Sequence, residues 1–192
     1  HFTYDVIRLF EFIRDHLLEE LYTLEGLEFL RAHRTQEELE FVFCHPLTQE
    51  VAYQSLLKKR REELHLLVAR RLEAAYRERL HELYDVLAYH YSRTQNVDKA
   101  VYYLQKAGDR ARALYANHDA LELYDEALGQ LQGLAPTPER QIQAARLLVE
   151  RGRLCRLLGE VEDAFAAFEA CQQVAARLKD EALHARCLYE LG

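Results

Sequence analysis

Three arginines carry the side-chain chemistry that is easiest to place in this chain. Arg146, Arg153 and Arg156 follow one another at helical spacings within one predicted helix. A guanidinium group can pair with a carboxylate through two parallel hydrogen bonds, so these three side chains are candidate partner-binding residues. The alternative is a surface charge stripe that Glu150 and Glu160 balance.

A histidine at a predicted strand–helix junction is the second candidate. His45 follows the apolar run 41–44 and precedes Pro46, a residue well suited to the first turn of a helix. An imidazole N–H can donate to a phosphate oxygen, and the ring titrates near neutral pH. The alternative is that His45 only caps or packs at the corner between strand and helix.

The remaining polar residues form no catalytic or metal-binding pattern. Glu37 and Glu38 fall in a predicted loop without an apolar pocket, and Ser55 and Ser92 lack a nucleophile-elbow context. We therefore predict that the chain is not an enzyme. No metal site is predicted, because HxxxH and HExxH spacings are missing among His65, His81, His90, His118 and His184.

Composition excludes several classes of protein. The 192 residues carry a net charge of −7, which argues against a dedicated nucleic-acid surface. The basic run 58–61 is followed at once by Glu62 and Glu63, which favours a solvated helix turn. No apolar run reaches the length of a membrane span. The chain contains no Met, so we expect it to be a piece of a longer protein.

The cysteines have no CxxC spacing and lie on apolar faces of predicted helices and strands. This pattern predicts reduced, buried thiols in a cytoplasmic protein. The four cysteines are Cys44, Cys155, Cys171 and Cys187.

Only 7 Gly and 3 Pro interrupt the chain, so helices should dominate. Apolar residues within 5–24 recur at helical spacing, and Gly26 is a natural stop. The apolar segments 27–30 and 39–43 flank the polar stretch 32–38, which predicts a β-hairpin over about 27–43. A helix, a stop and a hairpin form the end of a winged-helix domain. We predict a partial winged helix over 1–57, including a helix from Pro46 to about Leu57.

The rest of the chain predicts a helical arm followed by repeats. Residues 58–80 form the linking arm. Residues 81–192 form tetratricopeptide (TPR)-like repeats, truncated at the C-terminus, in which small residues lie where helices approach closely. The predicted fold is therefore mostly α: a TPR-like α-solenoid of antiparallel helix pairs after a partial winged helix. Such arrays usually hold a protein or peptide in a groove.

Several details of the repeats are also predicted. Asp98 is the expected helix cap after a turn at 94–96. Residues 98–116 are expected to form one long or kinked helix with Gly108 as its weak point. A linker is expected at 133–138 and a turn at 158–160. The solenoid core is expected to include Tyr89, Tyr91, Tyr102 and Tyr103.

Four segments of the chain together resemble STAND-type signalling ATPases. They are 41–57, the run Arg60-Arg61-Glu62-Glu63-Leu64-His65, 99–104 and 113–117. The resemblance is to the region after the ATPase domain, in bacterial predicted ATPases that follow class III adenylate/guanylate cyclase domains. It covers about two thirds of the chain. The family implies a P-loop ATPase in cis, a winged helix and a TPR arm, with ATP or ADP controlling a switch between closed and open forms.

The resemblance also implies a role for His45. In the family, a histidine at the winged-helix edge contacts the β-phosphate of the bound nucleotide, and His45 matches it by position. Cys44 and Pro46 stand where the family's usual version has Met and Asp. His45 is thus a predicted nucleotide sensor of the full-length parent only, because the chain has no GxxxxGK[ST] phosphate loop.

Two other functions remain open at this point. One is a stand-alone TPR adaptor that binds acidic peptides without any nucleotide. The other is the sensor arm of a maltose-regulator-type transcription activator, whose DNA-binding domain would lie elsewhere in the parent. The favoured prediction is a non-catalytic regulatory fragment that relays partner binding on the TPR arm to a nucleotide switch.

Overall fold

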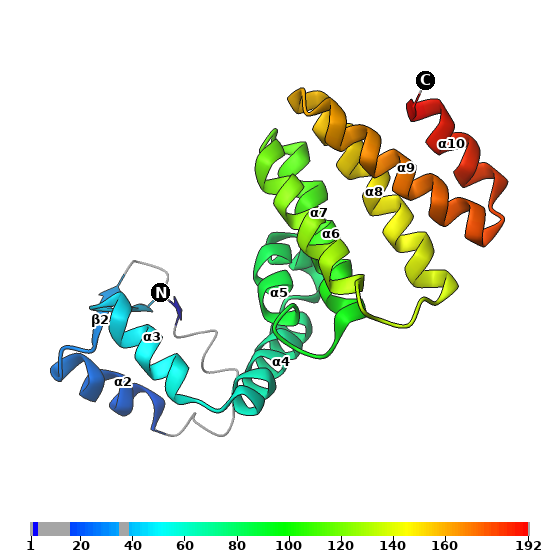
Figure 1. The fold of residues 1–192 in the computed structure, drawn as a ribbon. Coiled ribbons are helices and arrows are strands. Elements are labelled where there is room, and N and C mark those ends of the chain that lie inside the picture. The colour runs from blue at the N-terminus through cyan, green and yellow to red at the C-terminus, as the bar shows by residue number, and fades with distance from the viewer. Residues whose placement is uncertain (1, 4–15, 35–38, 192) are drawn as a thin grey trace. The chain divides into compact units, whose positions relative to one another are not determined.

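The computed structural model describes residues 2–3, 16–34 and 39–191. The chain divides into two units, His1–Arg77 and Glu78–Gly192. Most described residues are helical, which confirms the mostly-α prediction. Figure 1 shows the order of the elements along the chain.

The first unit contains a small antiparallel sheet. Its strands are β1 (Phe2–Thr3), β2 (Leu30–Arg34) and β3 (Leu39–Phe43), in the order β1-β3-β2. Leu30 pairs with Phe43 and Arg34 with Leu39, so β2 and β3 form the hairpin that the sequence predicts.

One helix covers the hairpin through apolar side chains. Helix α2 (Leu17–Gly26) buries Leu17 and Leu21 against Leu30 of β2 and Phe41 of β3. Gly26 ends the helix, as predicted. Strand β2 begins later than expected, because Leu27 and Phe29 belong to the connection from α2 rather than to the sheet. The predicted helical stretch 5–15 lies outside the described residues.

Two further helices complete the first unit. Helix α3 (Pro46–Ser55) has Pro46 in its first turn and ends two residues before the expected Leu57. Helix α4 (Lys58–Ala75) and a short 3-10 helix, Arg77–Glu82, occupy the predicted linking arm. The Tyr53 hydroxyl lies 3.0 Å from Nε2 of the buried His65, which ties α3 to α4.

The second unit is a row of helices in which each packs on the one before it. The order is α5 (Tyr84–Tyr91), α6 (Val97–Ala113), α7 (Asn117–Leu131), α8 (Pro138–Leu158), α9 (Val161–Leu178) and α10 (Glu181–Leu191). Figure 1 shows α6 to α10 lying side by side in chain order. Buried alanines such as Ala100, Ala107, Ala120 and Ala127 allow the close packing of these helices.

Helix ends follow local signals for the most part. Thr137 accepts a hydrogen bond from the backbone N–H of Arg140 at the start of α8, and Gly159 ends α8 with a φ of 83°. The predicted linker and the predicted turn at 158–160 lie at these two ends. The cap of α6 is Asn96 and not Asp98, because the Asn96 side chain accepts from the N–H of Lys99.

The prediction of one helix over 98–116 is right as far as Ala113 and wrong about the end of the helix and about Gly108. Helix α6 ends at Ala113, and Tyr115 has a φ of 62° in the turn before α7. Gly108 is no weak point: it lies inside α6, buried against the ring of Tyr124. The small residue permits a close helix contact rather than a kink.

The aromatic prediction is right for half of its residues. Tyr91 and Tyr103 are buried, and their rings stack at a centroid distance of 5.5 Å. Tyr89 and Tyr102 are exposed instead, because they project from the opposite faces of α5 and α6. The guanidinium of Arg93 covers the ring of Tyr89 at 3.6 Å from its centroid.

The cysteine prediction is wrong for one pair. Cys171 of α9 and Cys187 of α10 are both buried and form a disulfide. The packing of α10 on α9 brings the two side chains together, which spacing in the sequence does not reveal. Cys155 is a buried free thiol, as predicted, whereas Cys44 is only partly buried.

Candidate functional site

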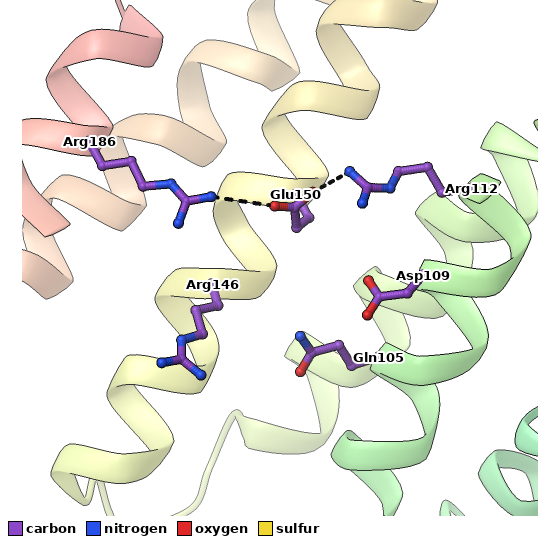
Figure 2. A pocket seen from close by; sticks show the side chains of 6 residues that line it. All are labelled: Gln105, Asp109, Arg112, Arg146, Glu150 and Arg186. Carbon is purple, nitrogen blue, oxygen red and sulfur yellow. Dashed lines mark hydrogen bonds and ion pairs between the residues drawn. The ribbon is translucent and has the colours of Figure 1, made fainter. Parts of the chain in front are cut away.

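A hollow of about 340 Å³ in the second unit gathers charged side chains from three alternate helices. Helix α6 contributes Gln105, Asp109 and Arg112, helix α8 contributes Arg146 and Glu150, and helix α10 contributes Arg186. Figure 2 shows these side chains, with those of α6 extending toward α8. Because the lining comes from alternate helices, the stacking of the array creates the hollow.

Glu150 organises the charges in this hollow. Its carboxylate lies 2.5 Å from the guanidinium of Arg112, 3.0 Å from that of Arg153 and 3.7 Å from that of Arg186. The side chain of Glu150 is only 17% exposed, so these pairs are partly shielded from water. One carboxylate therefore connects the three helices that line the hollow.

A second carboxylate, Glu190, is buried beside the hollow. Its Oε1 accepts from Nε of Arg153 at 2.7 Å, and its Oε2 accepts from Arg156 at 2.9 Å. Burial alone would raise the pKa of Glu190, but the hydrogen bond from Arg153 and the charges of both arginines lower it overall. Glu190 is therefore ionised at neutral pH and holds α10 to α8.

The three predicted partner-binding arginines occupy two different environments. Arg146 is exposed, lines the hollow and, among the described residues, makes no hydrogen bond or ion pair. Arg153 and Arg156 are engaged by Glu190. The structure thus brings Arg146 together with residues that sequence reasoning missed: Gln105, Asp109, Arg112, Glu150 and Arg186.

No periodic signal in the sequence marks those missed residues as a group. They come from three helices whose register depends on tertiary packing. The single available signal is the alternation of charge on α8, where Arg146, Glu150 and Arg153 share one face at helical spacing.

Asp109 faces the hollow but already has a partner. The hydroxyl of the buried Tyr124 donates to its Oδ1 at 2.7 Å. Burial, followed by this hydrogen bond and the charge of Asp109, raises the pKa of Tyr124 far above its usual value. Tyr124 therefore stays protonated and fixes the position of Asp109.

A second hollow, of about 460 Å³, is lined from α5, α6 and the preceding 3-10 segment. The Arg110 and Lys106 side chains that line it already have partners. Arg110 donates to the carbonyls of His81 and Glu82, and Lys106 lies 5.8 Å from the ring centroid of Tyr102. This hollow offers less free charge than the one around Arg146.

His45 lies at the N-cap of α3 with an exposed side chain. Its backbone carbonyl accepts from the N–H of Thr48 at 3.0 Å, but its imidazole makes no capping hydrogen bond. Capping by the side chain is therefore not what the structure shows. The exposed ring is free to contact a group outside the described residues.

The other sequence candidates have structural partners or lie outside the described residues. The hydroxyls of Ser55 and Ser92 donate to the carbonyls of Ala52 and Tyr89. Arg60 pairs with Glu63 in the first turn of α4. Glu37 and Glu38 belong to the part of the chain that is not described.

The described residues hold neither a cluster of metal ligands nor a helix that could span a membrane. Across 2–3, 16–34 and 39–191, no three His, Cys, Asp or Glu side chains gather in a way that would hold a metal ion. None of the helices in these ranges combines the length and apolar character needed to cross a bilayer. Comparison with known proteins finds no matching family model, curated protein or solved structure.

Proposed function

We propose that this chain is a non-catalytic regulatory module of a STAND-type signalling ATPase. In this proposal the helical array holds a protein or peptide, and the region around His45 passes the bound state to a nucleotide site in cis. The observation that carries the proposal is the charged hollow that α6, α8 and α10 line together. A site shared by alternate helices is well suited to an extended ligand that crosses them.

The position of His45 supports the nucleotide half of the proposal. The imidazole is exposed at the start of α3 and makes no capping bond, so a ring N–H is free to donate to a phosphate oxygen. The nucleotide, ATP or ADP, would be held by the ATPase domain, and His45 would report which one is bound.

The thiol and phenol chemistry of the array supports a non-catalytic role. Burial raises the pKa of Cys155, so the thiol is protonated at neutral pH and is a poor nucleophile. Tyr124 is likewise held protonated against Asp109. In this proposal the ATPase domain of the parent protein is the partner of the module in cis.

The test uses a protein that joins this chain to its ATPase domain. His45→Ala should change the ratio of bound ATP to bound ADP and the basal activity. The matched control is His33→Ala, an exposed histidine on β2, which should change neither. Unchanged nucleotide occupancy in the His45→Ala protein would show that the sensor assignment is wrong.

A further inference from the structure

We propose that the hollow between α6, α8 and α10 binds one carboxylate of an acidic peptide, with Arg146 as the principal ligand and Arg186 as the second. This inference rests on the peptide-binding half of the proposed function and names the chemistry of its ligand. It does not depend on His45 or on a nucleotide.

The charge balance of the lining residues points to an anion. Three arginines, Arg112, Arg146 and Arg186, face two carboxylates, Asp109 and Glu150. The lining therefore carries one unbalanced positive charge, although the whole chain carries −7. A single negative group would complete the pairing.

The distances show which arginines are free to bind it. Arg112 already pairs with Glu150 at 2.5 Å. Arg186 lies 3.7 Å from Glu150, beyond the length of a good hydrogen bond, and its side chain is 50% exposed. Arg146 has no partner among the described residues, so its guanidinium can take both oxygens of a carboxylate.

The lining also supplies an uncharged donor. Gln105 extends from α6 toward α8, on the side of the hollow opposite Arg186 (Figure 2). Its amide N–H can donate to a ligand without adding charge. A chain that places one acidic side chain beside Arg146 would then contact all three helices.

The two resident carboxylates select against a more highly charged group. A phosphorylated side chain carries about −1.5 to −2 at neutral pH. In this hollow it would leave excess negative charge beside Asp109 and Glu150, a like-charge contact that disfavours binding. The expected ligand is therefore Asp or Glu, and not phosphoserine.

The experiment measures binding of the 192-residue chain to immobilised peptides with randomised flanks. The central residue of each set is Glu, Gln or phosphoserine. The variant is Arg146→Gln, because the Arg146 side chain is exposed and makes no hydrogen bond or ion pair among the described residues. The matched control is Arg177→Gln, an exposed arginine at the end of α9 that lies outside the hollow.

The Glu-centred set should bind most strongly. Arg146→Gln should weaken that binding by about tenfold, which corresponds to about 1.4 kcal/mol, and Arg177→Gln should leave it unchanged. Arg186→Gln should weaken it by a smaller factor.

Three results would overturn the proposal. Equal binding of the Glu and Gln sets would exclude a carboxylate, and stronger binding of the phosphoserine set would exclude charge selection. An equal loss in Arg146→Gln and Arg177→Gln would show that only the overall charge matters. If no peptide binds, the peptide-binding half of the proposed function fails as well, whereas the His45 experiment can fail without affecting this one.

Discussion

The backbone of Gly108 in α6 lies against the ring of Tyr124 in α7, and a Cβ atom at Gly108 would come within 2.6 Å of Cε1 of that ring. The same relationship recurs between Gly152 of α8 and Phe168 of α9, again at 2.6 Å. Both rings are buried, so neither can move aside easily. The two contacts set how closely the helices of each pair approach.

Gly108→Ala should therefore destabilise the array despite the higher helix propensity of alanine. Overpacking a rigid core costs about 1–3 kcal/mol, whereas the Gly-to-Ala change in a helix gains about 1 kcal/mol. Gly129→Ala in α7 is the matched control, because nothing lies within 4 Å of the added Cβ. Urea denaturation should show the control equal to or more stable than the parent chain and the Gly108 variant less stable than the control by about 1–3 kcal/mol. Equal stabilities would contradict the close contact.

Tyr124→Phe should change how stability depends on alkaline pH. The pKa of Tyr124 is raised in the folded protein. The contribution of Tyr124 to the free energy of unfolding is therefore complete below the unfolded pKa of about 10 and is lost as the pH rises beyond that value. The variant lacks the hydrogen bond to Asp109 and should be less stable by about 1 kcal/mol at neutral pH. The difference in the free energy of unfolding between wild type and Tyr124→Phe should be smaller at about pH 11. Urea denaturation of both proteins measures it, and Tyr115→Phe, an exposed tyrosine, is the control.

Glu190→Gln should loosen the attachment of α10 to α8. We expect the free energy of unfolding to fall by about 1–2 kcal/mol at neutral pH. The loss is no larger because the side chains of Arg153 and Arg156 are 35% and 57% exposed, so water replaces part of the pairing. The pKa of Glu190 is lowered, so its contribution is present above the unfolded value of about 4.3 and is lost as the pH falls through the folded value.

The measurement is thermal unfolding followed at neutral and acidic pH. The difference in melting temperature between wild type and Glu190→Gln should disappear at acidic pH. Glu169→Gln, an exposed residue of α9, should match wild type throughout. A gap that does not depend on pH would contradict the ionised state of Glu190.

The disulfide between Cys171 and Cys187 leaves Cys44 and Cys155 as the free thiols of the chain, and their number can be measured. Alkylation of the chain after denaturation without reductant should modify two cysteines, Cys44 and Cys155, and mass spectrometry reads the number directly. Reduction should lower the free energy of unfolding by about 3 kcal/mol, because it removes a short covalent loop. Modification of all four cysteines would instead restore the sequence prediction of reduced thiols and would suit a reducing compartment.

Local signals in the sequence anticipate much of the fold. Pro46 begins a helix, and Gly26 and Gly159 end helices. The β-hairpin is anticipated too, although its first strand is shifted, because Leu27 and Phe29 look strand-like without pairing in the sheet. The same local reading chose Asp98 as a cap, since both it and Asn96 are suitable residues for that position.

The amino-acid sequence by itself indicated the helices, some of their ends and the presence of arginines on one helix, because these depend on neighbours within a few residues. Only the tertiary structure decided which arginine remains free. Glu190 engages Arg153 and Arg156 from a different helix, whereas Arg146 opens into a hollow that α6 and α10 complete. Pairing between charges depends on distance in space, and residues far apart in the chain meet only when the helices have packed.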